Sequence, residues 1–399
     1  MDTHLTSATD GISAWIVAMV ATAVLGVVLG VFGSIGVLIG PLATAYAVPR
    51  SQSALLFAAA LAVHSVTARG AGQVLDRWGP RPLLAAAAAG MAVGPLAAAA
   101  ASTVWLAVVG YGAGVGLASA CTWVATTGVV SAAFQRRRSA ALGLLTAGPA
   151  AGGVVFAPMM AALTEAHGPR TTCVLVAALG FTACAAGAVL LGCHRAHAPA
   201  TASTGASDPE PKAGGFLAAG LLMSLVVFIP IVHLGVTATG LGLSTSHAAV
   251  LLAVVSAVSA ATRLGTGWLA TPETLPSFYR AAHLLVAAAF SAWALTAHVA
   301  ASPTIPAFLM LLVVAALFGA GYGAWLSLGP AILAATCTPA RLGRALGALA
   351  SIVGLGGVIG SVLAGPLIET SATALLIGCA LLALAAAAAL TGRPSARTT

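Results

Sequence analysis

Residues 14–41 read AWIVAMVATAVLGVVLGVFGSIGVLIGP and contain no charged side chain. In a helix that rises 1.5 Å per residue, about 20 apolar residues cross the roughly 30 Å of hydrocarbon in a bilayer, so this run is long enough to span a membrane. The strands of a membrane barrel are short and alternate between apolar and polar residues, whereas here Ala, Val, Leu and Gly follow one another without alternation. The run therefore predicts a transmembrane helix.

Similar runs recur along the whole chain, which has 399 residues and is 60% hydrophobic and 6% charged. An ordinary soluble domain is about 25% charged, so this composition indicates a protein whose surface faces lipid. The predicted spans are 14–41, 52–75, 82–101, 103–130, 139–164, 171–193, 214–240, 245–270, 278–301, 303–335, 342–368 and 371–391. We expect an all-α membrane protein with twelve transmembrane helices in two six-helix bundles.

One polar stretch divides these spans into six and six. It contains Ser, Thr, Pro, Asp, Glu and the only Lys of the sequence, a composition typical of a flexible linker. We expect an N-terminal bundle over 1–193, a cytoplasmic linker over 194–213 and a C-terminal bundle over 214–399.

The formal net charge of +8 would suggest a nucleic-acid partner in a soluble protein, but its placement argues against one. If both termini are cytoplasmic, the outer loops hold only Arg50 and Arg170. The inner segments then hold Arg77, Arg81, Arg136, Arg137, Arg138, Arg195, Lys212, Arg280, Arg341, Arg344, Arg393 and Arg397. This asymmetry is the positive-inside bias. We expect a multi-pass monomer of the inner membrane, in contact with membrane lipids, with both termini cytoplasmic and no nucleic-acid partner.

A charged motif, Gly72-Gln-Val-Leu-Asp76-Arg77-Trp-Gly79-Pro-Arg81, stands between the second and third spans. A carboxylate at a helix end beside two guanidiniums can form charge-assisted pairs that hold neighbouring helices in one conformation and open in another. The motif resembles the Gly-x-x-x-Asp-Arg-x-Gly-x-Arg loop of major facilitator transporters. That resemblance implies a carrier with two related halves, in which Asp76, Arg77 and Arg81 form a conformational latch. Anchoring of a cytoplasmic loop is the alternative interpretation of the two arginines.

The start of the motif recurs in the second half as Gly267-Trp-Leu-Ala-Thr271, with Thr271 in the place of the aspartate. The repeat supports two related halves, and the lost carboxylate predicts a degraded second latch.

Two further motifs indicate a narrower family. Asp10-Gly11-Ile-Ser-Ala-Trp15 precedes the first span, and Phe134-Gln-Arg-Arg-Arg-Ser-Ala-Ala-Leu-Gly-Leu-Leu-Thr-Ala-Gly148 enters the fifth. Both resemble motifs of the monocarboxylate transporter family and its oxalate-formate antiporter-like relatives. In that family a histidine of span seven and an arginine of span eight meet the substrate, so the resemblance implies that His233 and Arg263 do so here.

Arg263 is the one charged side chain well inside the eighth span. Burying an arginine in a bilayer costs about 2.5–3.5 kcal/mol on insertion scales, so a function is the default interpretation. Ser256, Ser259 and Arg263 fall at i, i+3 and i+7, hence on one helical face. The planar guanidinium matches the two oxygens of a carboxylate, which predicts an organic anion as substrate. Alternatively, Arg263 reaches the inner interface or pairs with carbonyl groups.

Three other residues complete the predicted site. His233 lies near mid-membrane in span seven, where Pro230 is expected to loosen the helix. Tyr322 and Trp123 are candidate cavity walls, with helix packing or interfacial anchoring as the alternative. No Asp or Glu lies near mid-membrane in any predicted span. Coupling to protons would therefore use His233 or the acid group of the substrate, and uncoupled transport is the third option.

A rival hypothesis comes from Gly148-Pro149-Ala-Ala-Gly152-Gly153, which resembles a motif of drug/proton antiporters and makes drug or metabolite efflux the alternative function. Those exporters carry an arginine in span four, and the glycine-rich run at 110–116 has none. Close packing of helices explains both glycine runs equally well.

Other classes of protein have little support. The polar residues form no Ser/His/Asp set, carboxylate pair or His/Cys cluster, so no enzyme, metal or cofactor is expected. A receptor or structural membrane protein stays open. The sequence predicts a secondary active transporter that moves a small organic anion by alternating access.

Overall fold

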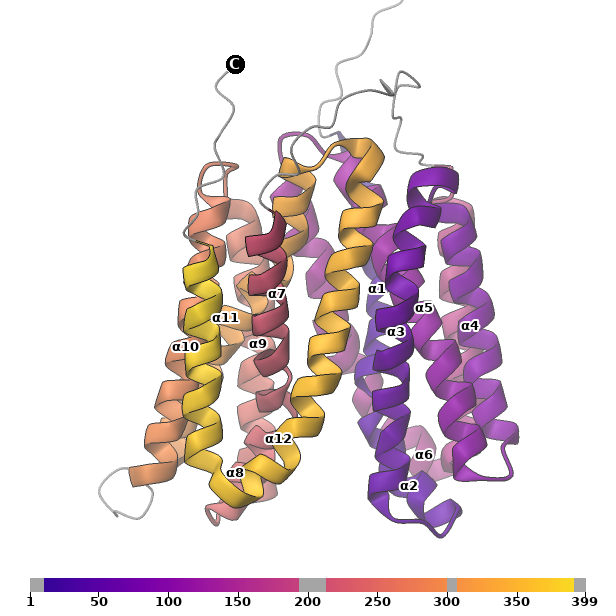
Figure 1. The fold of residues 1–399 in the computed structure, drawn as a ribbon. Helices are drawn as coiled ribbons and strands as arrows, with labels where there is room; N and C mark the ends of the chain where they lie inside the picture. Colours follow the sequence, from indigo (N-terminus) through magenta and orange to yellow (C-terminus); the bar gives the residue numbers. More distant parts are fainter. Residues whose placement is uncertain (1–10, 194–212, 300–306, 391–399) are drawn as a thin grey trace, which may run out of the picture. The chain divides into compact units, whose positions relative to one another are not determined.

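The structure is a computed structural model of the 399-residue chain, and it describes residues 11–193, 213–299 and 307–390. Within these ranges the chain is helical and contains no strand (Figure 1). Nearly all of the predicted linker, 194–212, lies outside the described residues. The all-helical class expected from the composition is confirmed.

Two compact units divide the chain. Unit 1 comprises Met1–Ala198, Gly267–Leu269 and Leu333–Ala350, and unit 2 comprises Pro199–Thr266, Ala270–Ile332 and Ser351–Thr399. In chain order the helices are α1 (Ile12–Gly33), α2 (Gly36–Ala45), α3 (Arg50–Trp78), α4 (Pro80–Ala100), α5 (Val104–Ala133), α6 (Arg138–Leu190), α7 (Ala213–Val227), α8 (Ile229–Gly240), α9 (Thr245–Leu269), α10 (Leu275–Val299), α11 (Ala307–Thr336) and α12 (Pro339–Ala389). Unit 1 therefore holds α1 to α6 together with the ends of α9 and α11 and the start of α12.

The number of spans among the described residues agrees with the twelve that the sequence predicts. Ten helical segments there are long and apolar enough to cross a membrane, and an eleventh span is formed by the bent pair of α7 and α8. One of the ten, α6, runs for 53 residues but has a non-helical residue, Gly168, at φ 81° and ψ 165°. This conformation favours glycine and separates the predicted fifth and sixth spans, which brings the total to twelve.

Two predicted spans are interrupted in the structure. α1 ends at Gly33, and α2 begins at Gly36. Glycine costs about 1 kcal/mol relative to alanine inside a helix, and the Ser34 hydroxyl donates to the carbonyl of Gly30 at 2.7 Å, so the break is favoured locally. The bend of 43° between α7 and α8 lies beside Pro230, which lacks a backbone donor. The sequence predicted the second break but not the first.

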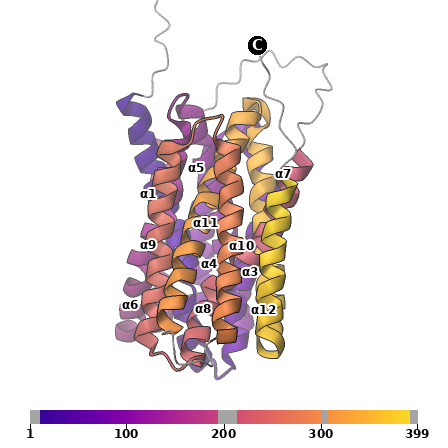
Figure 2. The ribbon, with the colours of Figure 1, turned by 90° about the vertical axis from the view of Figure 1, so that its left-hand side faces the viewer.

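Small residues let the helices of unit 1 approach closely. A Cβ atom added at Gly148 would lie 2.6 Å from the carbonyl oxygen of Thr22, so α6 and α1 touch there. A Cβ atom added at Gly112 would lie 2.6 Å from the side chain of Ala59, so α5 and α3 touch as well. The views in Figures 1 and 2 show these helices running alongside one another. Close packing of helices therefore accounts for glycines in both glycine-rich runs of the sequence, 110–116 and 148–153.

Unit 2 is organised around α11, which Figure 2 shows running alongside α9 and α10. A Cβ atom added at Gly319 would lie 2.7 Å from the carbonyl oxygen of Val255 in α9. One added at Gly321 would lie 2.8 Å from the carbonyl oxygen of Ala282 in α10. These backbone contacts on both sides fix the position of α11 along its axis relative to α9 and α10. That position places the α11 residues of the candidate site.

Candidate functional site

The predicted anion ligand, Arg263, is buried inside unit 2. It lies on α9, and only 3% of its surface is exposed. Its guanidinium lies over the ring of Tyr322 from α11, with 5.3 Å between Cζ and the ring centroid. Within about 6 Å the negative face of an aromatic ring attracts a cation. The tyrosine ring is therefore one of the groups that hold the guanidinium in the interior.

Two contacts set the position of Tyr322 along α9. A Cβ atom added at Gly323 would lie 2.9 Å from Cα of Ser259, so the two backbones touch beside the tyrosine. One turn farther along, Oγ of Ser327 lies 3.3 Å from Oγ1 of Thr266. The first contact places the backbone of Tyr322 beside that of Ser259, one turn before Arg263 on α9, and from there its ring reaches the guanidinium.

Ser259 shares the arginine's face of α9, as the spacing predicted. It is 1% exposed, and its Oγ has no hydrogen-bond partner among the residues that the structure describes. A buried hydroxyl left without a partner costs about 1–3 kcal/mol, so this group is available to a ligand oxygen. Ser256, by contrast, is half-buried, and its hydroxyl donates to the carbonyl of Leu252 at 2.9 Å.

His233 lies on α8 and is half-buried. Two residues later, a Cβ atom added at Gly235 would lie 3.8 Å from Cβ of Ala248, near the start of α9. Arg263 comes 15 residues after Ala248, which corresponds to about 22 Å along the helix. The structure therefore does not bring the histidine and the arginine into contact.

Trp123 belongs to unit 1. It lies on α5 and is 7% exposed. Its neighbour on that helix, Thr126, donates its hydroxyl to the carbonyl of Thr122 at 2.7 Å. Of the predicted substrate residues, the structure thus groups three in unit 2, Arg263, Ser259 and Tyr322, and places Trp123 in unit 1.

Asp76, at the end of α3, binds the start of α12 within unit 1. Its Oδ1 accepts a hydrogen bond from the backbone N–H of Gly343 at 2.8 Å, and its Oδ2 accepts one from that of Arg344 at 3.0 Å. The Arg344 Nε lies 3.5 Å from Oδ2. Negative charge at the N-terminal end of a helix is favoured by the helix dipole. The carboxylate thus joins two helices that are far apart in the sequence.

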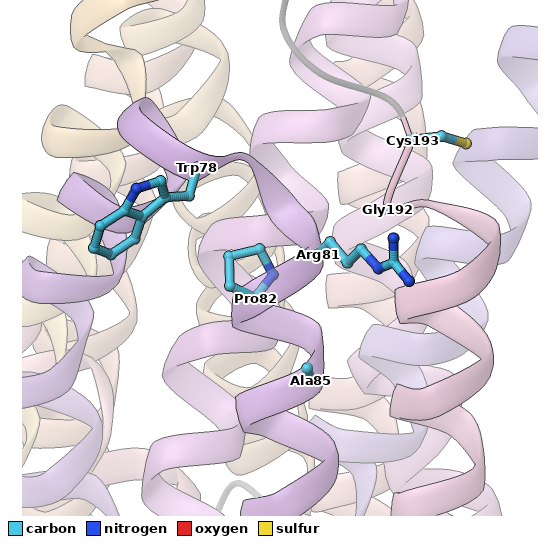
Figure 3. A pocket seen from close by; sticks show the side chains of 6 residues that line it. All are labelled: Trp78, Arg81, Pro82, Ala85, Gly192 and Cys193. Carbon is cyan, nitrogen blue, oxygen red and sulfur yellow. The ribbon is translucent and has the colours of Figure 1, made fainter.

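Arg77 and Arg81 do not join this contact. Both are exposed, and neither forms an ion pair within the part of the chain that the structure describes. The Arg81 side chain extends toward Gly192 at the end of α6 and lines an open pocket with Trp78 and Cys193 (Figure 3). The partner of the motif's carboxylate is Arg344, which the sequence analysis did not single out.

A second contact that sequence reasoning missed lies at the end of α9, within unit 1. The Trp268 ring stacks on that of Trp15 with 5.9 Å between centroids and 8° between planes, and the Arg137 guanidinium lies 5.6 Å from its centroid. Trp268 follows Gly267, which corresponds to Gly72 in the repeated motif. The repeat was the signal that could have marked this position, although its carboxylate is missing.

Twelve apolar spans, one of which holds a buried arginine, define a polytopic α-helical membrane protein. The family profile of the Major Facilitator Superfamily matches residues 14–305, so the chain belongs to that superfamily. The proteins of this superfamily are membrane transporters of small molecules and not enzymes.

The relatives support the narrower resemblance. Monocarboxylate transporter 11 of Mus musculus is 30% identical over 274 residues, which are 67% of this chain and 61% of the mouse protein. The Fujikurins efflux protein of Gibberella fujikuroi is 28% identical over 209 residues, 49% of this chain and 43% of the fungal protein. The alignments thus span less than two thirds of the length of these relatives.

A solved structure confirms the fold. The human organic anion transporter MFSD10 (TETRAN) superposes with a TM-score of 0.72 and 16% sequence identity, over 96% of this chain and 100% of that chain. At this identity the likeness concerns the fold alone.

Proposed function

We propose that this transporter carries a small organic anion of the monocarboxylate type, and that Arg263 binds its carboxylate. The observation that carries the proposal is the burial of Arg263 in α9, 3% exposed, against the ring of Tyr322. An arginine in a membrane span costs free energy to insert, and intramembrane arginines typically line substrate pathways.

The chemistry of the site fits a carboxylate. A guanidinium presents a planar fork of donors that can bind both oxygens at once. In a buried site such charge-assisted bonds are stronger than in water, because fewer water dipoles screen them. The Ser259 hydroxyl, one turn away on the same face, offers another donor. The ring of Tyr322 limits the room beside the guanidinium, which favours a small anion.

The names of similar proteins support the proposed substrate class. Proteins named monocarboxylate transporters align with two thirds of this chain at 30% identity. The region that matches the superfamily profile, 14–305, includes the motif at 72–81 and Arg263.

Movement of the anion follows alternating access in this proposal. The Asp76 contact with the start of α12 holds one conformation and opens in the other. Arg77 and Arg81 belong to the latch as charges that Asp76 meets when it leaves Arg344. His233 in unit 2 and Trp123 in unit 1 are further substrate-binding residues in this proposal. In this proposal the protein acts as a monomer in the inner membrane. The arginine distribution supports the cytoplasmic placement of both termini.

Efflux of a drug or metabolite is the second candidate, because one relative is named an efflux protein. The two functions differ in the ligand group that is recognised. An anion carrier needs the carboxylate, whereas an exporter of amphipathic compounds needs aromatic and aliphatic walls.

Counterflow into proteoliposomes separates the two. Vesicles loaded with an unlabelled monocarboxylate should take up the labelled acid in a saturable manner and fail to exchange its neutral methyl ester. Exchange of neutral or cationic amphipathic compounds, with none for any carboxylate in the panel, would support efflux and overturn the anion proposal.

A further inference from the structure

His64 lies at the midpoint of α3 (Arg50–Trp78), and neither the latch nor the Arg263 site uses it. Its Nδ1 is 2.8 Å from Oγ of Ser119 on α5. The residue is half-buried. An ionisable residue in a membrane span is functional by default, and histidine is the side chain that changes charge near neutral pH.

The hydrogen bonds of Ser119 indicate which ring nitrogen of His64 carries the proton. The Ser119 hydroxyl donates to the carbonyl of Gly116 at 2.9 Å. A hydroxyl has one proton, so while it is donated to the carbonyl, Oγ can only accept from the histidine. The neutral imidazole therefore holds its proton on Nδ1. Its Nε2 then carries the lone pair and is the position that can take a second proton.

Close packing keeps this geometry in place. A Cβ atom added at Gly116 would meet the carbonyl oxygen of Ala60 and lie 2.8 Å from Cβ of Val63, so α5 lies directly against α3 one turn before Ser119. Glycine at this position lets the hydroxyl reach the ring of His64. The serine is 0% exposed, which removes water as a competing donor.

Few charged or titratable groups surround His64 within unit 1. α1 and α2 contain none, and the Phe32 ring of α1 is the nearest aromatic, with 6.4 Å between centroids. On α5, the titratable side chains are Tyr111 and Cys121, and both are buried.

The charged residues of α3, α4 and α12 lie away from His64 along the helix axes. On α3 itself, Arg69 comes five residues later, about 7.5 Å along the axis, and is exposed. Arg81 is exposed at the start of α4. The start of α12 meets α3 from Ala68 onward, where Arg344 pairs with Asp76. No carboxylate of the described residues in unit 1 contacts the imidazole.

We propose that His64 is a proton-binding site of this transporter, which takes up a proton on Nε2 while Ser119 holds the Nδ1–H. The inference rests on the proposed anion transport in one respect, because the proton would move with the anion. The proton comes from water on one side of the membrane and returns to water on the other. Bound together, one proton and one monocarboxylate carry no net charge, so the coupled cycle is electroneutral.

Nitrogen-15 NMR of histidine-labelled protein in lipid nanodiscs tests the site without any substrate. The resonance that disappears in His64→Asn should report the Nδ1–H tautomer at neutral and alkaline pH and should titrate at acid pH, where Nε2 takes up the second proton. Ser119→Ala should convert the neutral form toward the Nε2–H tautomer, whereas the control Ser65→Ala should not, because Ser65 bonds only its own helix, at the carbonyl of Leu61. A neutral Nε2–H tautomer in the parent protein, or the absence of titration at acid pH, overturns the proposal.

Transport tests the coupling. A gradient of one pH unit, worth about 1.4 kcal/mol, should drive roughly tenfold accumulation of the anion by the parent protein. In His64→Asn, whose amide can still donate to Ser119, the accumulation ratio should fall to about one while counterflow at equal pH persists. Undiminished accumulation by this variant contradicts the proposal. If the parent exchanges no anion, the proposed function fails, and the NMR result still decides whether His64 binds the proton as inferred.

Discussion

The guanidinium of Arg263 and the ring of Tyr322 are the smallest unit of the proposed mechanism. A cation over an aromatic face gains about 0.5–2 kcal/mol, depending on desolvation, and the attraction resides in the ring rather than in the hydroxyl. The pair therefore fixes the orientation of the fork that the anion would meet.

Substitutions of Tyr322 separate the ring from the hydroxyl. Tyr322→Phe keeps the aromatic face, and its anion affinity should stay within about twofold of the parent's. Tyr322→Leu removes the face and should weaken affinity by about 2- to 30-fold. Competition of unlabelled anion against labelled uptake measures both values. Equal losses of anion affinity in Tyr322→Phe and Tyr322→Leu would show that the hydroxyl, and not the ring, holds the guanidinium.

The sequence located this arginine because it is the only charge well inside its span, but it could not choose between aromatic partners. Tyr322 and Trp325 lie three residues apart on α11, and the sequence does not tell which of the two rings meets the arginine. The structure buries Trp325 to 2% exposure and directs Tyr322 over the guanidinium. The choice depends on the backbone contact of Gly323 with Ser259, which brings together segments 64 residues apart. No local pattern encodes such a contact.

At the scale of helices, the decisive contact is that of α3 with the start of α12. The two amide bonds to Asp76 are 2.8 and 3.0 Å long, and hydrogen bonds to a charged group contribute about 1.5–3 kcal/mol each. The Arg344 side chain is 60% exposed at 3.5 Å, and such surface pairs contribute about 0–1 kcal/mol. The amides therefore outweigh the ion pair.

Asp76→Asn should slow anion turnover by about tenfold and leave the affinity nearly unchanged, because the amide of asparagine meets one of the two N–H groups with a donor instead of an acceptor. Arg344→Gln is the matched control and should slow turnover by less than about fivefold. Exchange rates and half-saturation concentrations in proteoliposomes measure both effects. A control variant as slow as Asp76→Asn, or a large loss of affinity in the latter, would contradict the latch proposal.

The motif around Asp76 could be recognised in the sequence, but the residue that pairs with its carboxylate could not. Arg77 and Arg81 were expected beside the carboxylate because they are close in sequence. The observed partner, Arg344, is 268 positions away from Asp76. A single sequence reports local charge, whereas the pairing of helix ends depends on tertiary packing. The glycines offered a clue, because Gly343 approaches Asp76 so closely that an added Cβ atom would lie 2.5 Å from Oδ1.

At the scale of the whole molecule, composition and periodicity were sufficient for the fold. Continuous apolar runs can only form helices in lipid, because every backbone group must find its partner within the segment. Twelve spans were expected and are present in the described residues. The break at Ser34 was not foreseen, because Gly33 and Gly36 resemble the packing glycines found elsewhere in the spans.

Orientation in the membrane is predicted from the distribution of arginines. A reporter that is active only in the cytoplasm should work when it is fused after Ala202 and after Thr399. Ala202 falls outside the described residues, in the predicted linker. Failure of this reporter at Ala202, with activity there of a reporter that works only in the periplasm, would contradict the predicted topology.

The central claim is that Arg263 binds the carboxylate of the transported anion, and counterflow by Arg263→Lys and Arg263→Ala tests it most directly. Lysine keeps the charge but loses the planar fork, and alanine loses both. Alanine also costs less to insert than arginine, so both variants should reach the membrane in normal amounts. The account predicts that both variants insert normally and lose saturable exchange of an acid that the parent carries, by about 10-fold or more. Exchange by Arg263→Ala at the parent's rate and affinity would contradict it.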